Sequence, residues 1–245
     1  MPFSLRALVV SAFAFASLPA VAQALTVAPM QVEMVSSGSR SRATVTVVNN
    51  SDQPMPIEAV VQRMSLDESG KAQTVRSDEE FLIMPPQAMI PPGATQNFRI
   101  QWLGEPMLDT SQSFYVCFNQ VPVKLPQGKA ALQVVMSMGV MVNVAPPQGM
   151  SDLKVVGTGV VNGKDGKRYP VVTVQNPGRI HALLPQATLK LSSGGWSETL
   201  SAGQLSESLG SGLVQPGKRR RFVLPIALPQ GVSSLQASLE MNARR

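Results

Sequence analysis

Residues 132–144 read LQVVMSMGVMVNV and alternate over an unusual length. Seven successive same-side positions, from Leu132 to Val144, carry no polar residue, which predicts one apolar face of a β-strand. At about 3.3 Å per residue the strand would be about 40 Å long, roughly twice a typical strand. It is either a long core strand, or a row that projects beyond its own core. Met136 and Met138 suit the second interpretation, because unbranched thioethers adapt to different surfaces. An apolar row at a sheet edge is an aggregation hazard, so its presence would indicate a partner.

The segments on either side also alternate like strands. Apolar residues occupy every second position in 44–48, 98–102 and 114–118, and no stretch keeps a helical period. Such faces are buried when two sheets pack together. The pattern stops at APPQG, residues 145–149, and resumes afterwards, and NGKDG at 162–166 predicts a hairpin turn. We therefore expect an all-β chain with two tandem β-sandwiches, residues 25–145 and 146–245.

The first 24 residues have the features of an export signal. Arg6 is their only charge, Ala7 to Ala16 is apolar except for one serine, and Ala22-Gln23-Ala24 fits a small-x-small cleavage site. We expect a signal peptide at 1–24 and an exported protein without membrane insertion, because no later stretch is long and apolar enough to span a bilayer.

Composition excludes most catalytic and metal chemistry. The 245 residues include one Cys and one His, so no internal disulfide and no multi-Cys or multi-His metal site can form. We expect no catalytic residues, no cofactor and no metal, with His181 an ordinary loop residue. The net charge of +6 could indicate nucleic acid, but the export signal argues against that partner. A copper carrier using Met136, Met138 and Met141 is disfavoured, because Met141 falls on the opposite strand face.

The order of several short motifs resembles one family. FLIMPP at 81–86, IPPGATQNFRI at 90–100 and SFYVCFNQVP at 113–122 precede the long strand, which ends in Ala145-Pro146. VQNPG at 174–178 and LVQPGKRRRF at 213–222 follow in the second half. Together they resemble the periplasmic pilus chaperones of the chaperone–usher pathway over nearly the whole mature chain.

The resemblance implies two immunoglobulin-like domains in an L shape and a periplasmic location. It also implies donor-strand complementation, in which the long strand completes the open groove of a pilin subunit. The subunit is then delivered to an outer-membrane usher. The residues that would fill the pockets of the subunit are Leu132, Val134, Met136, Met138 and Val140. A second copy of the chain would cap the strand when no subunit is bound. The alternative function is a structural or adhesive β-sandwich component of a surface fibre.

The chain departs from the family pattern where the resemblance implies ionic contacts. Gln31 and Met141 occupy the positions of two cations that would anchor the carboxyl terminus of the pilin. Gln112 and Ala145 occupy those of an inter-domain ion pair. Either the chain belongs to a divergent branch, such as the archaic class, or its clients are held differently. Arg99 is the first candidate for a substitute anchor, with a solvated arginine on a sheet face as the alternative. Weaker candidates are Arg40, Arg42 and Arg63.

Overall fold

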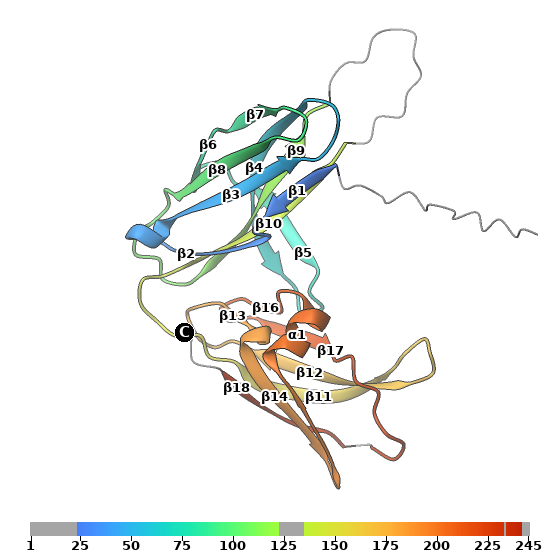
Figure 1. Cartoon of the computed structure of the whole chain (residues 1–245). Coiled ribbons are helices and arrows are strands. Elements are labelled where there is room, and N and C mark those ends of the chain that lie inside the picture. Colours follow the sequence, from blue (N-terminus) through green and yellow to red (C-terminus); the bar gives the residue numbers. More distant parts are fainter. Residues whose placement is uncertain (1–23, 123–134, 233, 242–245) are drawn as a thin grey trace, which may run out of the picture.

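The computed structural model describes residues 24–122, 135–232 and 234–241, in which two β-rich domains follow one another at an angle (Figure 1). Residues 1–23, which hold nearly all of the expected signal peptide, lie outside the described part. Within the described ranges, no helix is long and apolar enough to cross a membrane. The predicted fold class, all-β with two sandwich domains in tandem, is confirmed. The predicted boundary at residues 145/146 falls between the last strand of the first domain and the first strand of the second.

The first domain is a sandwich of two sheets. One sheet has the strand order β1-β3-β8-β6, and the other has the order β2-β10-β9-β4-β5, with β7 also paired to β4. Its strands are β1 (Leu25–Ala28), β2 (Gln31–Val35), β3 (Arg42–Asn49), β4 (Met55–Leu66), β5 (Ala72–Arg76), β6 (Phe81–Met84), β7 (Gln87–Ile90), β8 (Thr95–Trp102), β9 (Gln112–Gln120) and β10 (Ser137–Ala145). A short 3-10 turn, η1 (Ser39–Ser41), precedes β3.

Aromatic side chains fill the space between these sheets. Phe98, Phe114 and Phe118 have no exposed surface. The rings of Phe98 and Phe118 lie 4.9 Å apart, and Phe81 meets Phe114 edge-on at 5.0 Å. These contacts join β8 and β6 of one sheet to β9 of the other, as the alternating pattern predicted.

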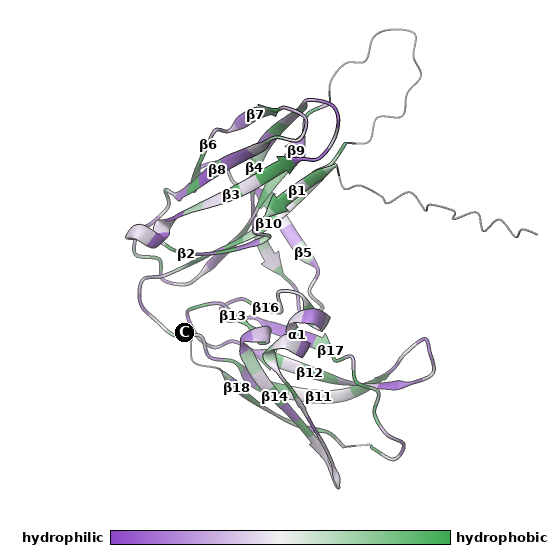
Figure 2. Ribbon diagram, viewed as in Figure 1, coloured by the Kyte–Doolittle hydropathy of each residue, from purple (hydrophilic) through white to green (hydrophobic). Residues whose placement is uncertain are grey.

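The second domain is a smaller sandwich. Its sheets have the orders β11-β12-β17 and β15-β14-β18, and β13 pairs separately with β16. The elements are β11 (Lys154–Asn162), β12 (Arg168–Gln175), β13 (Ala182–Leu183), η2 (Leu184–Gln186), β14 (Ala187–Ser193), β15 (Trp196–Leu200), α1 (Ala202–Leu209), β16 (Leu213–Val214), β17 (Arg219–Val223) and β18 (Gln236–Met241). Hydrophobic residues occur along the strands of both domains (Figure 2).

Two local features of this domain test the sequence analysis. The predicted hairpin is present: Asn162 pairs with Arg168, and Gly166 adopts a φ of 76° in the turn. The helix α1 was not anticipated. It begins with a capping box, in which the side chain of Ser201 and that of Gln204 satisfy each other's backbone groups. The Ser-x-x-Gln spacing was therefore a signal that sequence reasoning could have used.

The two ends of the long strand have different neighbouring strands. β10 begins at Ser137, whereas residues 132–134 lie outside the described part. On one side, residues 137–144 pair antiparallel with β9. On the other side, only residues 141–145 pair, parallel to β2. The strand was predicted at the sheet edge, and this holds for its outer part alone, because β2 covers the inner part.

Candidate functional site

The outer part of β10 presents free backbone groups. The Met141 N–H donates to the Met30 carbonyl on the β2 side, and the Met136 carbonyl accepts from Gln120 on the β9 side. Because backbone direction alternates along a strand, the N–H and C=O groups of Ser137 and Gly139 point away from β9. No described strand pairs with them there. This segment can accept an added strand.

The apolar row leaves the core within this segment. Val144, Val142 and Val140 have no exposed surface, whereas Met138 and Met136 are partly buried and pack against the rim of the core. Val140 was predicted to fill a pocket of a bound subunit. In this structure the Val140 side chain is buried between the two sheets of its own domain, and its role toward a subunit stays a prediction.

The remaining predicted pocket-filling residues fall in two groups. Met136 and Met138 lie at the open edge, next to each other on one face. Leu132 and Val134 lie outside the described residues. The next residue, Val135, belongs to the opposite face of the row and is 47% exposed.

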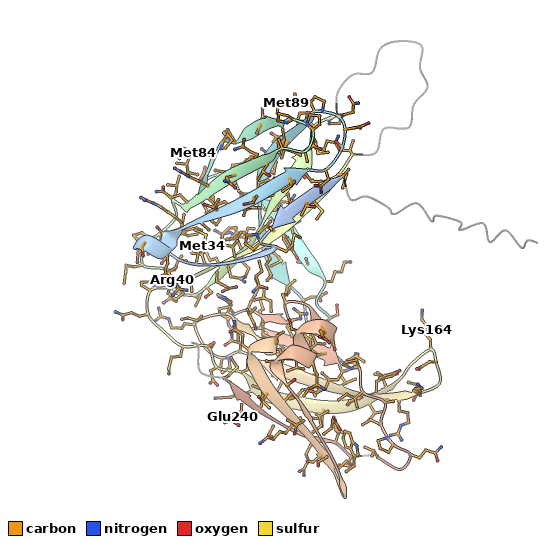
Figure 3. All side chains as sticks on the ribbon, viewed as in Figure 1. Met34, Arg40, Met84, Met89, Lys164 and Glu240 are labelled. Atoms are coloured by element: carbon orange, nitrogen blue, oxygen red, sulfur yellow. The ribbon has the colours of Figure 1, made fainter. Side chains whose placement is uncertain are left out.

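Arg99 lies on a different side of the first domain. It projects from β8 into a hollow of about 350 Å³ on the outer face of the four-stranded sheet, beside Arg42, Leu82 and Met84. Met84, labelled in Figure 3, is 48% exposed there. The inter-domain contacts lie on the outer face of the other sheet, so the sandwich separates them from Arg99. A ligand anchored by Arg99 would therefore lie on this outer face and not between the domains.

The positions that the resemblance assigns to two cations are adjacent but uncharged. Gln31 and Met141 are register partners in the β2–β10 pairing. Met141 is buried in an apolar cluster with Met64 and Leu66 of the first domain and Leu183 and Leu213 of the second. The inner end of β10 is therefore covered by the second domain through hydrophobic contacts.

A carboxylate lies beside this cluster. Glu33 Oε1 accepts hydrogen bonds from the amides of Asn143 at 2.9 Å and Gln31 at 3.0 Å, and Oε2 lies 2.5 Å from His181 Nε2. Burial raises the pKa of Glu33, but the hydrogen bond and charge of His181, with the two amides, outweigh it and hold the pKa below its ordinary value. The pair joins β2 of the first domain to the segment before β13 of the second.

His181 was expected to be an ordinary loop residue, and that expectation is wrong. Its side chain is 1% exposed, and its backbone N–H donates to Ser111 Oγ of the first domain at 3.1 Å. Nothing in the sequence around Glu33 pointed to this partner, because the two residues are far apart in the chain.

Gln215 makes a second polar connection between the domains. Its Nε2 donates to the carbonyl of Met64 at 2.9 Å, and its Oε1 accepts from the N–H of Leu66 at 2.8 Å. The side-chain amide thus pairs with the backbone of β4 as a neighbouring strand would. Outside this junction, Arg179 and Asp109 form an exposed ion pair across the domains.

The two residues at the expected positions of the inter-domain ion pair are also uncharged. Gln112 lies at the junction and Ala145 is buried, so neither supplies an ion pair. Arg63 is bound to Glu80 within the first domain at 2.6 Å. In the described part of the chain, no group of three or more His, Cys, Asp or Glu residues is placed to hold a metal ion.

The sequence profile described as "Pili and flagellar-assembly chaperone, PapD N-terminal domain" matches residues 25–149, half of the chain. The chain belongs to this family, and its members are chaperones of pilus assembly.

Solved structures share the fold at low sequence identity. The class 5 fimbriae chaperone CfaA has a TM-score of 0.55 and 12% identity, covering 90% of this chain and 100% of its own. A chain from a chaperone–tip adhesin complex of CFA/I fimbriae biogenesis has a TM-score of 0.53 and 11% identity, covering 90% of this chain and 99% of its own. At this identity the likeness shows the two-domain fold. A comparison with curated protein sequences finds no match.

Proposed function

We propose that this chain is a periplasmic chaperone that captures pilin subunits by donor-strand complementation along the outer part of β10. It then hands them to an outer-membrane usher, and it catalyses no reaction. The observation that carries the proposal is the open edge at Ser137 and Gly139, next to an apolar row that leaves its own core.

Backbone groups would supply the first part of the interaction. A strand of the subunit that adds to β10 can form ladder bonds with the free N–H and C=O groups of Ser137 and Gly139. Gly139 has no side chain on the sheet face, so the added strand can approach closely. The same edge would allow a second copy of the chain to cap the strand when no subunit is bound.

Side chains would supply the second part. Met138 and Met136 are partly released from the core, and the sequence continues the row through Val134 and Leu132. Full burial of one such side chain contributes about 1.5–3 kcal/mol. Four residues would give on the order of 8 kcal/mol before the cost of association. With Gln31 and Met141 at the expected anchor positions, the subunit depends on this row rather than on an ionic anchor.

Export supports the periplasmic location. The predicted signal peptide at 1–24 would direct the chain across the inner membrane. Membership in the pilus-assembly chaperone family supports pilin subunits as clients. It likewise favours the chaperone over a structural or adhesive component of the fibre.

The test compares two Asp substitutions in neighbouring residues. Met136→Asp should abolish co-purification of a pilin subunit from periplasmic extracts, because a carboxylate in an apolar pocket loses its hydration without a partner. Val135→Asp is the matched control, since Val135 belongs to the opposite face and is 47% exposed. It should leave capture within about twofold of the unchanged protein.

Thermal unfolding of both variants separates binding from folding. Met136 is partly buried at the rim, so its replacement should lower stability by about 1 kcal/mol and leave the chaperone folded. Undiminished recovery of the subunit with Met136→Asp would contradict donor-strand complementation. Purified chain that polymerises into fibres by itself would favour the structural alternative.

A further inference from the structure

The junction between the domains is short of hydrogen-bond partners. In the described part of the chain, five residues have a buried side-chain N or O atom without a partner. These residues are Gln112, Ser113, Asn143, His181 and Arg220. All five lie where the domains meet. Buried polar groups are normally satisfied, so such a concentration indicates that water or a ligand completes the junction.

A hollow of about 200 Å³ opens beside two of these residues, Gln112 and Ser113. The first domain contributes residues of β4, residues 110 and 111, and the start of β9, and the second contributes Gln215, Pro216 and Lys218. A water molecule takes a share of about 30 Å³ in the liquid, so the hollow holds several waters or one small ion. It is below the usual size of pockets for larger organic ligands, about 300–1,000 Å³.

The lining carries positive charge and hydroxyl groups, together with the amide of Gln112, whose Oε1 is a buried acceptor without a partner. Among its residues are two cations, Arg63 and Lys218, four that carry hydroxyl groups, and no carboxylate. Lys218 forms no ion pair in the described structure. Arg63 uses one N–H group on Glu80 and has others remaining.

Two serines complete the set of donors. Ser113 is 2% exposed and its Oγ has no partner. Ser111 is 8% exposed, and its Oγ accepts from the His181 N–H, so its own proton remains to be donated. Glu80 is paired with Arg63, and Asp109 is paired with Arg179.

We propose that this hollow binds a small oxyanion, with Lys218 and Arg63 supplying charge and Ser113 and Ser111 supplying hydroxyl donors. Because β4 and β9 belong to one domain and Lys218 to the other, the bound anion ties the domains together. The chemistry fits free inorganic phosphate or a carboxylate group of a protein. The site contains neither Gln31 nor Met141, nor any residue of the open edge of β10. It therefore does not depend on the proposed function.

The test is thermal unfolding of the purified protein in sodium phosphate, with sodium chloride at equal ionic strength as the reference. Phosphate should raise the midpoint with a saturable dependence, since a ligand that binds only the folded state stabilises it. Phosphate also strengthens hydrophobic burial in a general way, but that effect does not saturate. Sodium acetate forms a parallel arm: an equal rise in acetate identifies a carboxylate as the natural ligand, and a rise confined to phosphate identifies the free ion.

Two variants locate the site. Lys218→Ala should weaken phosphate binding by about tenfold or more, because charge-assisted bonds are the strong ones. Lys164→Ala is the matched control. Lys164 projects from the tip of the β11–β12 hairpin, away from the junction (Figure 3), and its loss should leave the affinity unchanged.

Ser113→Ala distinguishes a ligand donor from a structural residue. Removing a buried hydroxyl that has no partner should leave the stability in chloride equal or higher. The same change should weaken phosphate binding by several fold. The proposal is overturned if phosphate acts no differently from chloride, or if Lys164→Ala reduces the response as much as Lys218→Ala.

Discussion

The inner and outer parts of β10 share one alternating pattern but have different surroundings. From Met141 to Ala145 the strand lies between β2 and β9 and is covered by the second domain. From Ser137 to Val140 it has β9 as its only described neighbour. Alternation therefore shows which face of a strand is apolar, whereas the neighbouring strands decide whether that face is core or available to a partner.

Hydrogen bonds at the domain junction also distinguish the inner part of β10 from the outer part. Asn143, on the inner part, donates to Glu33, which in turn meets His181 of the second domain. The inner part is therefore held by hydrogen bonds as well as by packing. A fixed inner part would give the outer part a defined direction, and preorganisation of this kind reduces the cost of binding.

The largest expected difference comes from the same substitution in the two parts. Val142→Asp should lower the free energy of unfolding by about 4 kcal/mol or more, because Val142 has no exposed surface and the carboxylate would have no partner. Met136→Asp should cost about 1 kcal/mol. Urea denaturation of both variants checks the comparison. Equal losses would show that the outer row is core as well.

Alanine substitutions should locate more closely the residue at which the apolar row of β10 leaves the core. Val140→Ala should cost about 2 kcal/mol, because it removes buried methyl groups and leaves a cavity between the sheets. Met138→Ala should cost about 1 kcal/mol, since Met138 is partly buried at the rim. The measurement is again denaturant unfolding, now combined with recovery of the subunit. If Met138→Ala proves the more damaging to stability, the core extends further along β10 than its burial indicates.

A further prediction concerns the hydrogen bonds of the inner part. Glu33→Gln should lower the free energy of unfolding by about 1.5 kcal/mol at neutral pH. This value is at the lower end of the range for hydrogen bonds to charged groups, because a third of the Glu33 side chain is exposed. The pKa of Glu33 is lowered in the folded state, so its contribution is present above the ordinary value of 4.5. The contribution is lost as the pH falls through the folded-state pKa.

Unfolding as a function of pH checks this direction. The stability difference between the unchanged protein and Glu33→Gln should shrink as the pH falls below 4.5. Asp109→Asn is the control, because Asp109 is 87% exposed in its ion pair with Arg179 and should matter by less than about 0.5 kcal/mol. A difference that persists at low pH would contradict the role of the charged carboxylate.

Much of the fold could be predicted from short-range patterns. Alternation placed Phe98, Phe114 and Phe118 in the core, and the residues of the 162–166 turn marked a hairpin. These features follow from the two-residue period of a strand and from backbone preferences in turns. The helix α1 was missed because its short apolar pattern is weak beside the strands around it.

The candidate site was predicted less completely. The apolar row and its methionines were visible in the sequence, but the sequence did not show that Val140 is buried in its own domain. Arg99 was correctly placed on a polar face, yet that face belongs to the sheet away from the junction. Sequence patterns give the face of a strand and not the sheet to which it belongs.

Residue identity and local spacing were enough to predict the main strands, their apolar faces and the absence of cations at positions 31 and 141. The tertiary structure decided where the row of β10 leaves the core, because burial depends on β2 and on the opposing sheet. It also decided that Glu33 meets His181 and that Gln215 pairs with β4. Contacts between residues so far apart in the chain arise only when two folded domains pack together.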